Sequence, residues 1–204
     1  MDDCVTIHDA ELCRWFATVF AGELTEGAVN AYMAGAAVPY LNSVAEQCDI
    51  SAERETLEAA IRDWSRHTNA TRQLATDFAA HFLIPGQTAA MPYASYFEEQ
   101  TLFGHAHDRM RARLNNAGLG LTASENGPAD HLAVMLEYLA YLLDTNRLDA
   151  HSSGYVESEV LPLATSVSRR LEEQKPSTGF YPTVASILTL YLQALADRKL
   201  TARV

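Results

Sequence analysis

The sequence predicts an all-α protein built as a helical bundle. Three observations support this fold class. Apolar residues recur at helical spacing in most segments, no alternating strand pattern continues beyond four or five residues, and residues 128–144 are apolar on most of a helical circumference, as in a helix inside a packed core. With 48% hydrophobic residues among 204, the chain can bury a sizeable core and fits one large domain or two small lobes.

The first three helical segments are expected within residues 9–64. Helical spacing of apolar residues predicts a first helix over about residues 9–22, and a second helical region runs through 29–44 with an interruption near Pro39. Ser51 is a suitable N-cap for the third helix. The residues that define the first and third helices are Leu12, Trp15, Phe16, Val19 and Phe20, and then Leu57, Ile61 and Trp64.

Two further helices flank an irregular loop. Asn69 is suited to cap a helix that carries Asp77 and ends at Ile84-Pro85-Gly86, since proline cannot continue a helix. Residues 85–96 are expected to form a loop with aromatic anchors, and tyrosines in such a loop are typical of a contact surface. Helix resumes over about residues 97–116.

A Gly/Asn/Ser-rich stretch over residues 116–127 is the predicted hinge. It divides the chain into an acidic N-terminal lobe, a hinge and a C-terminal helical lobe, which cover residues 1–117, 118–127 and 128–204. After the helix that follows the hinge, the C-terminal lobe is expected to contain a helix over about 155–160 that restarts at Pro162 and runs to Glu173, and a last helix from Pro182.

The helix after the hinge is expected over about residues 128–144. Pro128 suits its first position, and Asp130 suits its first turn, where a carboxylate meets the positive end of the helix dipole. His131 is about 100° further round, so the two side chains do not face each other as a catalytic dyad would. Glu137 shares the stripe of Asp130, two turns on. On the residues alone, a dipole partner and a buried histidine are favoured over binding or catalytic roles.

Negative charge is concentrated in the N-terminal part. The chain carries a net charge of −11, and residues 1–60 hold eleven acidic and two basic residues, whereas residues 151–204 come to about +1. Such a surface disfavours nucleic acid and anionic membranes and favours a cationic partner, although a role in solubility accounts for it equally well. The chain begins without a signal-peptide pattern, and no apolar run approaches the ~18 residues of a membrane span.

No metal or cofactor site is predicted. His105 and His107 would point about 200° apart on a helix, which is poor for joint coordination, so a solvated helix face is favoured. No P-loop, H-E-x-x-H or G-x-S-x-G occurs. The three cysteines, Cys4, Cys13 and Cys48, form no C-x-x-C, and reduced thiols in the cytoplasm are expected.

Two motifs resemble the TorD family of redox-enzyme maturation chaperones, most closely its TorD branch. One is Pro92-Tyr93-Ala94-Ser95-Tyr96, and the other is Gly127-Pro128-Ala129-Asp130-His131-Leu132-Ala133, with Leu136-Glu137 just after. The resemblance covers about residues 10–195. One departure is that the family usually has Glu immediately before the proline, whereas this chain has Gly127, with Glu125 two places earlier. Three shorter matches belong to the same pattern: Leu74-Ala-Thr-Asp77-Phe78, Phe82-Leu83 and Gly179-Phe180-Tyr181.

The resemblance implies an all-helical fold, no catalysis and a molybdoenzyme client, apo trimethylamine N-oxide reductase. Such chaperones bind the client's twin-arginine signal peptide and its core, and they delay export until the molybdenum cofactor is inserted. Family members also form domain-swapped dimers, which suits the predicted hinge. The expected client-binding residues are Tyr93, Ser95, Tyr96, Glu125, Pro128, Asp130, His131, Glu137 and Asp77.

Two other function classes stay open at this point. An all-α enzyme would use His131 as a general base with Asp130 or Glu137 nearby, although nothing in the sequence indicates a substrate class. A non-catalytic adaptor would share the fold and lack any role in signal-peptide binding. Binding of a twin-arginine peptide and recovery of a molybdoenzyme precursor distinguish both from the chaperone.

Overall fold

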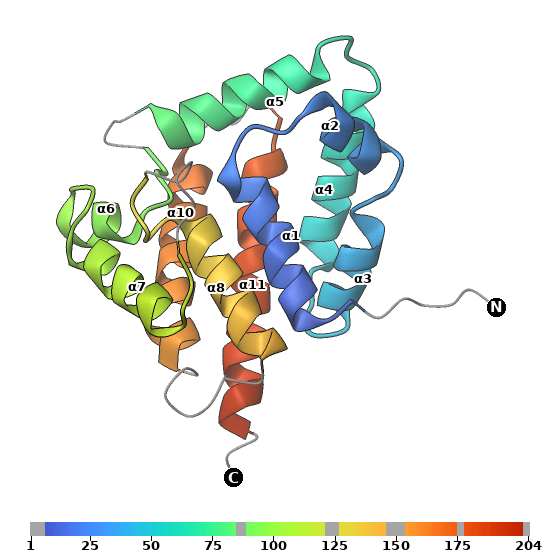
Figure 1. Ribbon diagram of the computed structural model, residues 1–204. Coiled ribbons are helices and arrows are strands. Elements are labelled where there is room, and N and C mark those ends of the chain that lie inside the picture. Colours follow the sequence, from blue (N-terminus) through green and yellow to red (C-terminus); the bar gives the residue numbers. More distant parts are fainter. Residues whose placement is uncertain (1–6, 85–88, 121–126, 146–153, 175–177, 202–204) are drawn as a thin grey trace.

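The helix that follows the predicted hinge, α8 (Leu132–Asp144), packs along α1 (Asp9–Ala21) near the middle of the molecule (Figure 1). The computed structural model describes residues 7–84, 89–120, 127–145, 154–174 and 178–201. Within these ranges the chain is helical, and the nearest approach to a strand is an isolated antiparallel bridge between Tyr93 and His131. The predicted all-α fold class is therefore confirmed.

The N-terminal part contains the predicted helices with small shifts. The break before α3 falls at residues 34–37, so Pro39 lies in the first turn of α3, where its missing N–H costs nothing. Ser51 is the first residue of α4 rather than its cap, and its N–H and hydroxyl both donate to Asp49 Oδ1. Asn69 precedes α5 without a side-chain cap bond. The elements are α2 (Glu26–Met33), α3 (Val38–Ala45), α4 (Ser51–Trp64), α5 (Ala70–Phe78) and the π-helical turn η1 (Ala79–Leu83).

The single helix predicted over 97–116 is in fact two, α6 (Ala94–Glu99) and α7 (His105–Asn116). Between them, Gln100 and Phe103 have φ of 56° and 61°, a left-handed conformation that no helix continues through. The Glu99 carboxylate accepts the N–H of His105 at 2.7 Å and lies so close to residue 104 that a Cβ there would be 2.5 Å from Oε1. A side chain at position 104 would therefore have to displace the Glu99 carboxylate, which here accepts the N–H of His105.

The C-terminal part forms the other side of the core. The segment expected over about 155–160 is a π-helical turn, η2 (Val156–Val160), and the expected restart at Pro162 is α10 (Leu161–Glu173), with Pro162 in its first turn. The last helix, α11 (Phe180–Thr201), begins two residues before the predicted Pro182. No helix in the described ranges is long and apolar enough to cross a membrane.

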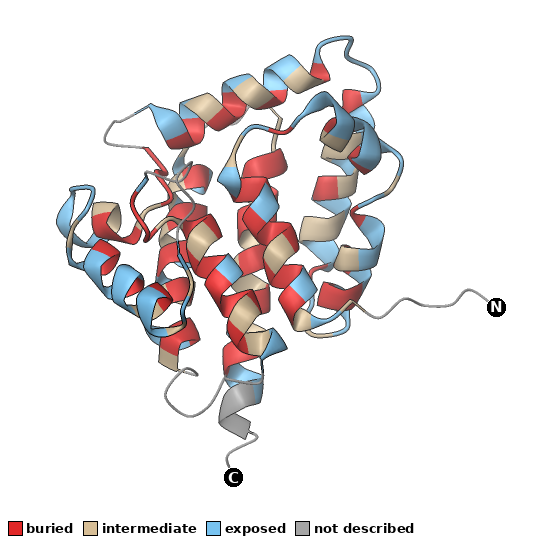
Figure 2. Ribbon diagram, viewed as in Figure 1, coloured by how far each residue is buried: buried red, intermediate tan, exposed pale blue. Residues whose placement is uncertain are grey.

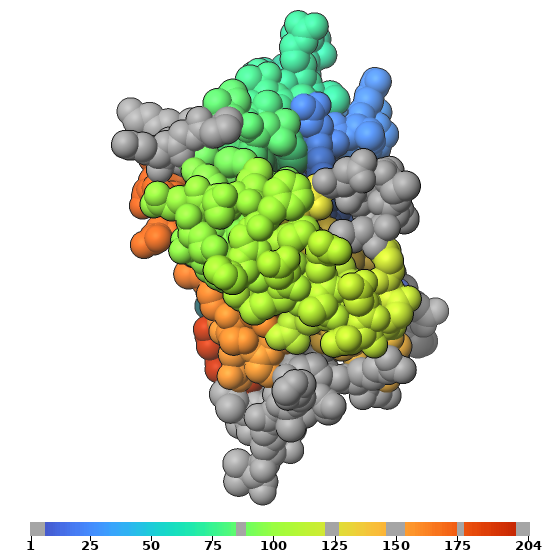
Figure 3. All heavy atoms as spheres, turned by 60° about the vertical axis from the view of Figure 1, so that its left-hand side comes forward, coloured from blue at the N-terminus to red at the C-terminus, as the bar shows by residue number. Residues whose placement is uncertain are grey.

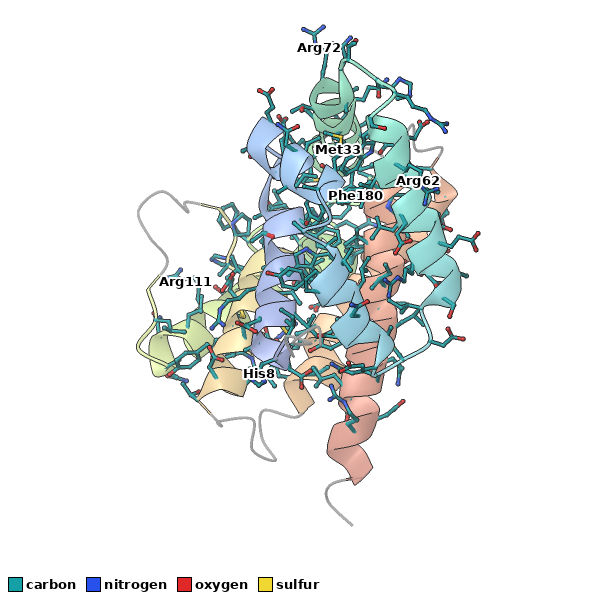
Figure 4. All side chains as sticks on the ribbon, turned by 90° about the vertical axis from the view of Figure 1, so that its right-hand side faces the viewer. His8, Met33, Arg62, Arg72, Arg111 and Phe180 are labelled. Atoms are coloured by element: carbon teal, nitrogen blue, oxygen red, sulfur yellow. The ribbon has the colours of Figure 1, made fainter. Side chains whose placement is uncertain are left out.

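One hydrophobic core joins residues from both sides of the predicted hinge. Burial is concentrated on α1, α8 and α11, as Figure 2 shows. At the opposite end from α7, the ring of Phe180 packs against Tyr32 of α2 and Trp64 of α4, with ring centroids 5.6 and 5.1 Å apart (Figure 4). Residues 121–126 of the predicted hinge lie outside the described residues, and the division into two lobes stays a prediction.

Candidate functional site

A cavity of about 690 Å³ lies between α1 and α8, beside the C-terminal end of α7. We refer to it as the α1–α8 cavity. Figure 3 shows the adjacent face of the molecule, where the segment from α6 to α7 covers α10. Most of the side chains that line the cavity are apolar or aromatic, which is typical of a ligand site. The lining residues are Arg14, Ala17, Thr18, Ala21, Tyr93, Leu114, Leu119, Gly120, Gly127, Pro128, His131, Ala133, Val134, Glu137, Tyr138 and Tyr141.

One wall of the cavity is formed where the two TorD-like motifs pair through their backbones. The N–H of Ala94 donates to the carbonyl of Asp130 at 3.1 Å, and the N–H of Leu132 donates to the carbonyl of Pro92 at 2.8 Å. This pairing keeps residues 128–131 out of the helix, so α8 begins at Leu132 and not at Pro128. The prediction that Pro128 opens the helix is therefore wrong, although its side chain does line the cavity.

Asp130 caps a different helix from the one predicted. Its Oδ2 accepts the N–H of Ser95 at 2.6 Å, in the first turn of α6, where Tyr93 occupies the N-cap position without a side-chain bond. The side chain is 1% exposed and does not line the cavity. Asp130 Oδ1 and Ser95 Oγ are both buried without a hydrogen-bond partner among the described residues. Asp130 therefore links the two motifs from behind the wall.

His131 is the N-cap of α8 and faces the cavity. Its Nδ1 accepts the N–H of Ala133 at 3.1 Å, so the proton of the neutral ring is on Nε2. Burial lowers the pKa of His131 to about 4, against the opposing effect of the Asp130 charge. His131 Nδ1 is engaged with Ala133 and the Asp130 carboxylate with Ser95, so these two residues do not form the acid–imidazole dyad that a general base requires.

Tyr93 and Glu137 also line the cavity. The ring of Tyr93 meets the imidazole of His131 edge-on, with centroids 4.8 Å apart. Burial, and then the nearby Asp130 charge, raise the pKa of the Tyr93 phenol. Glu137 lies on the exposed side of α8, and its Oε2 is 3.9 Å from Nε of Arg14. That guanidinium hydrogen-bonds instead to Asp144, which is the leading cause of the raised pKa of Arg14.

The remaining predicted site residues lie elsewhere. Asp77 is buried in α5, where its Oδ2 accepts both the N–H and the hydroxyl of Thr178, at 2.9 and 2.6 Å, and so fixes the start of α11. Tyr96 is half-buried against Phe97 and does not line the cavity. Glu125 lies outside the described residues. The structure thus brings together Tyr93, Pro128, His131 and Glu137, with Ser95 and Asp130 behind them.

Sequence reasoning missed two residues at this site. His107, which was expected on a solvated helix face, is 8% exposed, and its Nδ1 accepts the N–H of Ala129 at 2.8 Å. The burial of His107 could have been predicted from the sequence, because His107, Met110 and Leu114 follow the spacing of one buried helix face. Arg14, one of the two basic residues of the acidic segment 1–60, also lines the cavity. Within the described ranges, no group of three or more His, Cys, Asp or Glu is placed to hold a metal ion.

Comparison with known proteins places the chain in a family. Residues 46–173 match the nitrate reductase delta subunit family. The chain is similar to the chaperone protein TorD of Histophilus somni (strain 129Pt), with 29% identity over 92% of this chain and 98% of that protein. It is 28% identical to the chaperone protein TorD of Vibrio cholerae serotype O1 (strain ATCC 39541), covering 90% of this chain and 88% of the relative.

The fold comparison agrees with the sequence matches. The chain superposes on a crystal structure that is described as a redox enzyme maturation protein from Archaeoglobus fulgidus, with a TM-score of 0.57. The two chains are 20% identical, and the match covers 92% of this chain and 94% of the other. At that identity the similarity concerns the fold. The family of these chaperones is one of maturation proteins and not of enzymes. The chain belongs to the nitrate reductase delta subunit family, the TorD family of redox-enzyme maturation chaperones.

Proposed function

We propose that this chain is a cytoplasmic chaperone for a molybdoenzyme, trimethylamine N-oxide reductase. It binds the client's twin-arginine signal peptide and its apo core, and it delays export while the molybdenum cofactor is inserted. The observation that carries this proposal is the α1–α8 cavity, whose walls are mostly apolar and aromatic and include the carboxylate of Glu137. A signal peptide presents guanidinium groups next to an apolar stretch, and these need a carboxylate beside an apolar surface.

The residues of the cavity have different proposed roles in peptide binding. Tyr93 and Pro128 provide apolar and aromatic surface, and Glu137 provides the negative charge. His131 is uncharged at neutral pH, because burial lowers its pKa to about 4, so it does not repel a guanidinium and offers Nε2–H as a donor. Ser95 and Asp130 position this wall through the cap of α6. Tyr96 and Asp77 stay predicted client contacts that are not among the described lining residues of the cavity, and Glu125 stays a predicted contact outside the described residues.

Self-association follows from the same architecture. The contact between α1 and α8 joins segments on either side of the predicted hinge, so an equivalent contact can form within one chain or between two chains. We propose that the protein exchanges α1 or α8 to form a domain-swapped dimer. Gel filtration with light scattering measures the mass, and a strictly monomeric protein across the micromolar range would contradict the exchange.

The binding site is tested by calorimetry with a synthetic twin-arginine peptide. Glu137→Gln is expected to weaken binding about five- to tenfold, because one charge-assisted contact is lost. Glu55→Gln, the same substitution at an exposed site on α4, is the matched control and is expected to leave the affinity unchanged. A twin-lysine version of the peptide should bind more weakly than the twin-arginine one, since lysine lacks the forked donors of a guanidinium.

Two outcomes would count against the proposal. Equal affinity of wild type and Glu137→Gln for the twin-arginine peptide would remove Glu137 from the site. Copurification from cells that express the reductase precursor tests the client itself, and failure to recover any molybdoenzyme precursor would favour a non-catalytic adaptor instead.

A further inference from the structure

Arg14 brings a positive charge into the cavity that is proposed to receive cationic side chains. Among the described lining residues, Arg14 is the only basic and Glu137 the only acidic side chain. The two are on facing helices, α1 and α8, and about half of each side chain is exposed, 42% and 54%. A guanidinium that already belongs to the protein thus lies beside the carboxylate that a client arginine would approach.

Arg14 hydrogen-bonds to Asp144 and forms only a longer ion pair with Glu137. Its Nη2 hydrogen-bonds to Asp144 Oδ2, whereas its Nε is 3.9 Å from Glu137 Oε2, beyond hydrogen-bond distance. Glu137 and Asp144 are seven residues apart on α8, so they share one stripe about 10 Å long. The Arg14 guanidinium therefore lies between the two carboxylates, within ion-pair distance of each.

We propose that Arg14 is a built-in competitor for the client's arginine and that Asp144, by accepting its hydrogen bond, keeps it from forming one with Glu137. This inference rests on the proposed function and deepens it, because it names the residues that set the affinity of the cavity for a guanidinium. A client arginine binds Glu137 against the repulsion of Arg14. The Arg14–Asp144 pair reduces that repulsion, since the charge of Asp144 neutralises Arg14 and fixes its guanidinium at the outer end of the stripe.

The proposed role of Asp144 can be distinguished from a simple attraction of the peptide by an acidic surface. If Asp144 only attracted the peptide, its removal would weaken binding whether or not Arg14 is present. If Asp144 acts by holding Arg14, its removal matters only while Arg14 is there. The two residues are then coupled, and a double-mutant cycle measures that coupling directly.

The test is calorimetry of the full chain with the twin-arginine peptide at low salt, where charge effects between exposed groups are least screened. Arg14→Gln is expected to bind the peptide about three- to tenfold more tightly than wild type. Asp144→Asn is expected to bind about threefold more weakly, because the released guanidinium turns to Glu137. In the double variant Arg14→Gln/Asp144→Asn, the affinity should stay within about twofold of Arg14→Gln alone.

Two controls make the result specific. Arg14→Lys keeps the positive charge and is expected to show less than half of the gain seen with Arg14→Gln. A peptide with glutamines in place of the two arginines should show no gain with Arg14→Gln, because it brings no cation to Glu137.

Each outcome bears on one claim. If wild type binds the twin-arginine peptide and Arg14→Gln binds it no more tightly, the competitor role is overturned and the proposed function stands. The same role is overturned if Asp144→Asn weakens binding equally with and without Arg14. If neither wild type nor Arg14→Gln binds the peptide, the proposed function fails and the inference fails with it.

Discussion

Replacement of Asp130 by alanine is expected to lower the free energy of unfolding by about 2–3 kcal/mol. The carboxylate is buried and accepts the N–H of Ser95 in the first turn of α6. Without it, a buried donor at a helix start has no acceptor, because the N-cap residue Tyr93 supplies none. Asp130→Asn keeps an oxygen in the same place and is expected to lose less than half as much.

The measurement is urea unfolding followed by circular dichroism, with an exposed carboxylate as the control. Asp108→Ala, on the outer face of α7, should change the free energy of unfolding by less than about 1 kcal/mol. If Asp130→Ala were as stable as the control, the cap would contribute nothing. The same variants distinguish a positioning role of Asp130 from direct contact with the peptide, because Asp130 does not line the cavity. Folded Asp130→Asn should therefore bind the peptide within about threefold of wild type.

The helices themselves could be predicted from apolar spacing because each core face is a local pattern. The stripe of α1 and the nearly all-round apolar surface of α8 identify these helices and their burial. The local spacing of apolar residues carries no information on pairing between distant segments. Pro128 and Asp130 have the composition of a helix start, yet the backbones of Asp130 and Leu132 pair with those of Ala94 and Pro92, more than thirty positions earlier.

The irregular turn between α6 and α7 was not predicted from the sequence, for a related reason. Gln100 and Phe103 adopt positive φ values although neither is glycine, so composition gives no indication of a break between α6 and α7. Only Gly104 indicates the turn, and there the Glu99 carboxylate occupies the place that a side chain would take. Likewise, His131 caps α8 although histidine is not among the preferred N-cap residues.

The sequence predicts which segments form the candidate site, but it does not predict which of their side chains face the cavity. The two motifs do meet, and Tyr93, Pro128, His131 and Glu137 line one cavity. For Asp130 we propose a supporting role in place of the expected direct one, because its carboxylate accepts the N–H of Ser95 and does not line the cavity. The importance of Arg14 depends on the packing of α1 against α8, which a single sequence does not reveal.

The stability of the protein is expected to fall as the pH is lowered from 7.5 to 5.5, with His131 contributing about 1.4 kcal/mol of the loss. Burial lowers the pKa of His131 from 6.5 to about 4 in the folded state. Between these two values the unfolded chain binds a proton that the folded chain does not, so protonation favours unfolding. The contribution of His131 is therefore fully present above pH 6.5, declines below it, and reaches a loss of about 3 kcal/mol near pH 4.

His131→Asn isolates this effect from the other titrating groups. Asparagine is a good N-cap, so the variant keeps an acceptor for the N–H of Ala133 while it removes the titrating ring. The free energy of unfolding of both proteins is measured in urea at several pH values, and the difference between the two curves reports His131 alone. Wild type should lose stability relative to His131→Asn as the pH falls from 6.5 to 4.5. Parallel curves over that range would mean that His131 takes up its proton in the folded protein, and the cavity would then repel a cationic peptide at acidic pH.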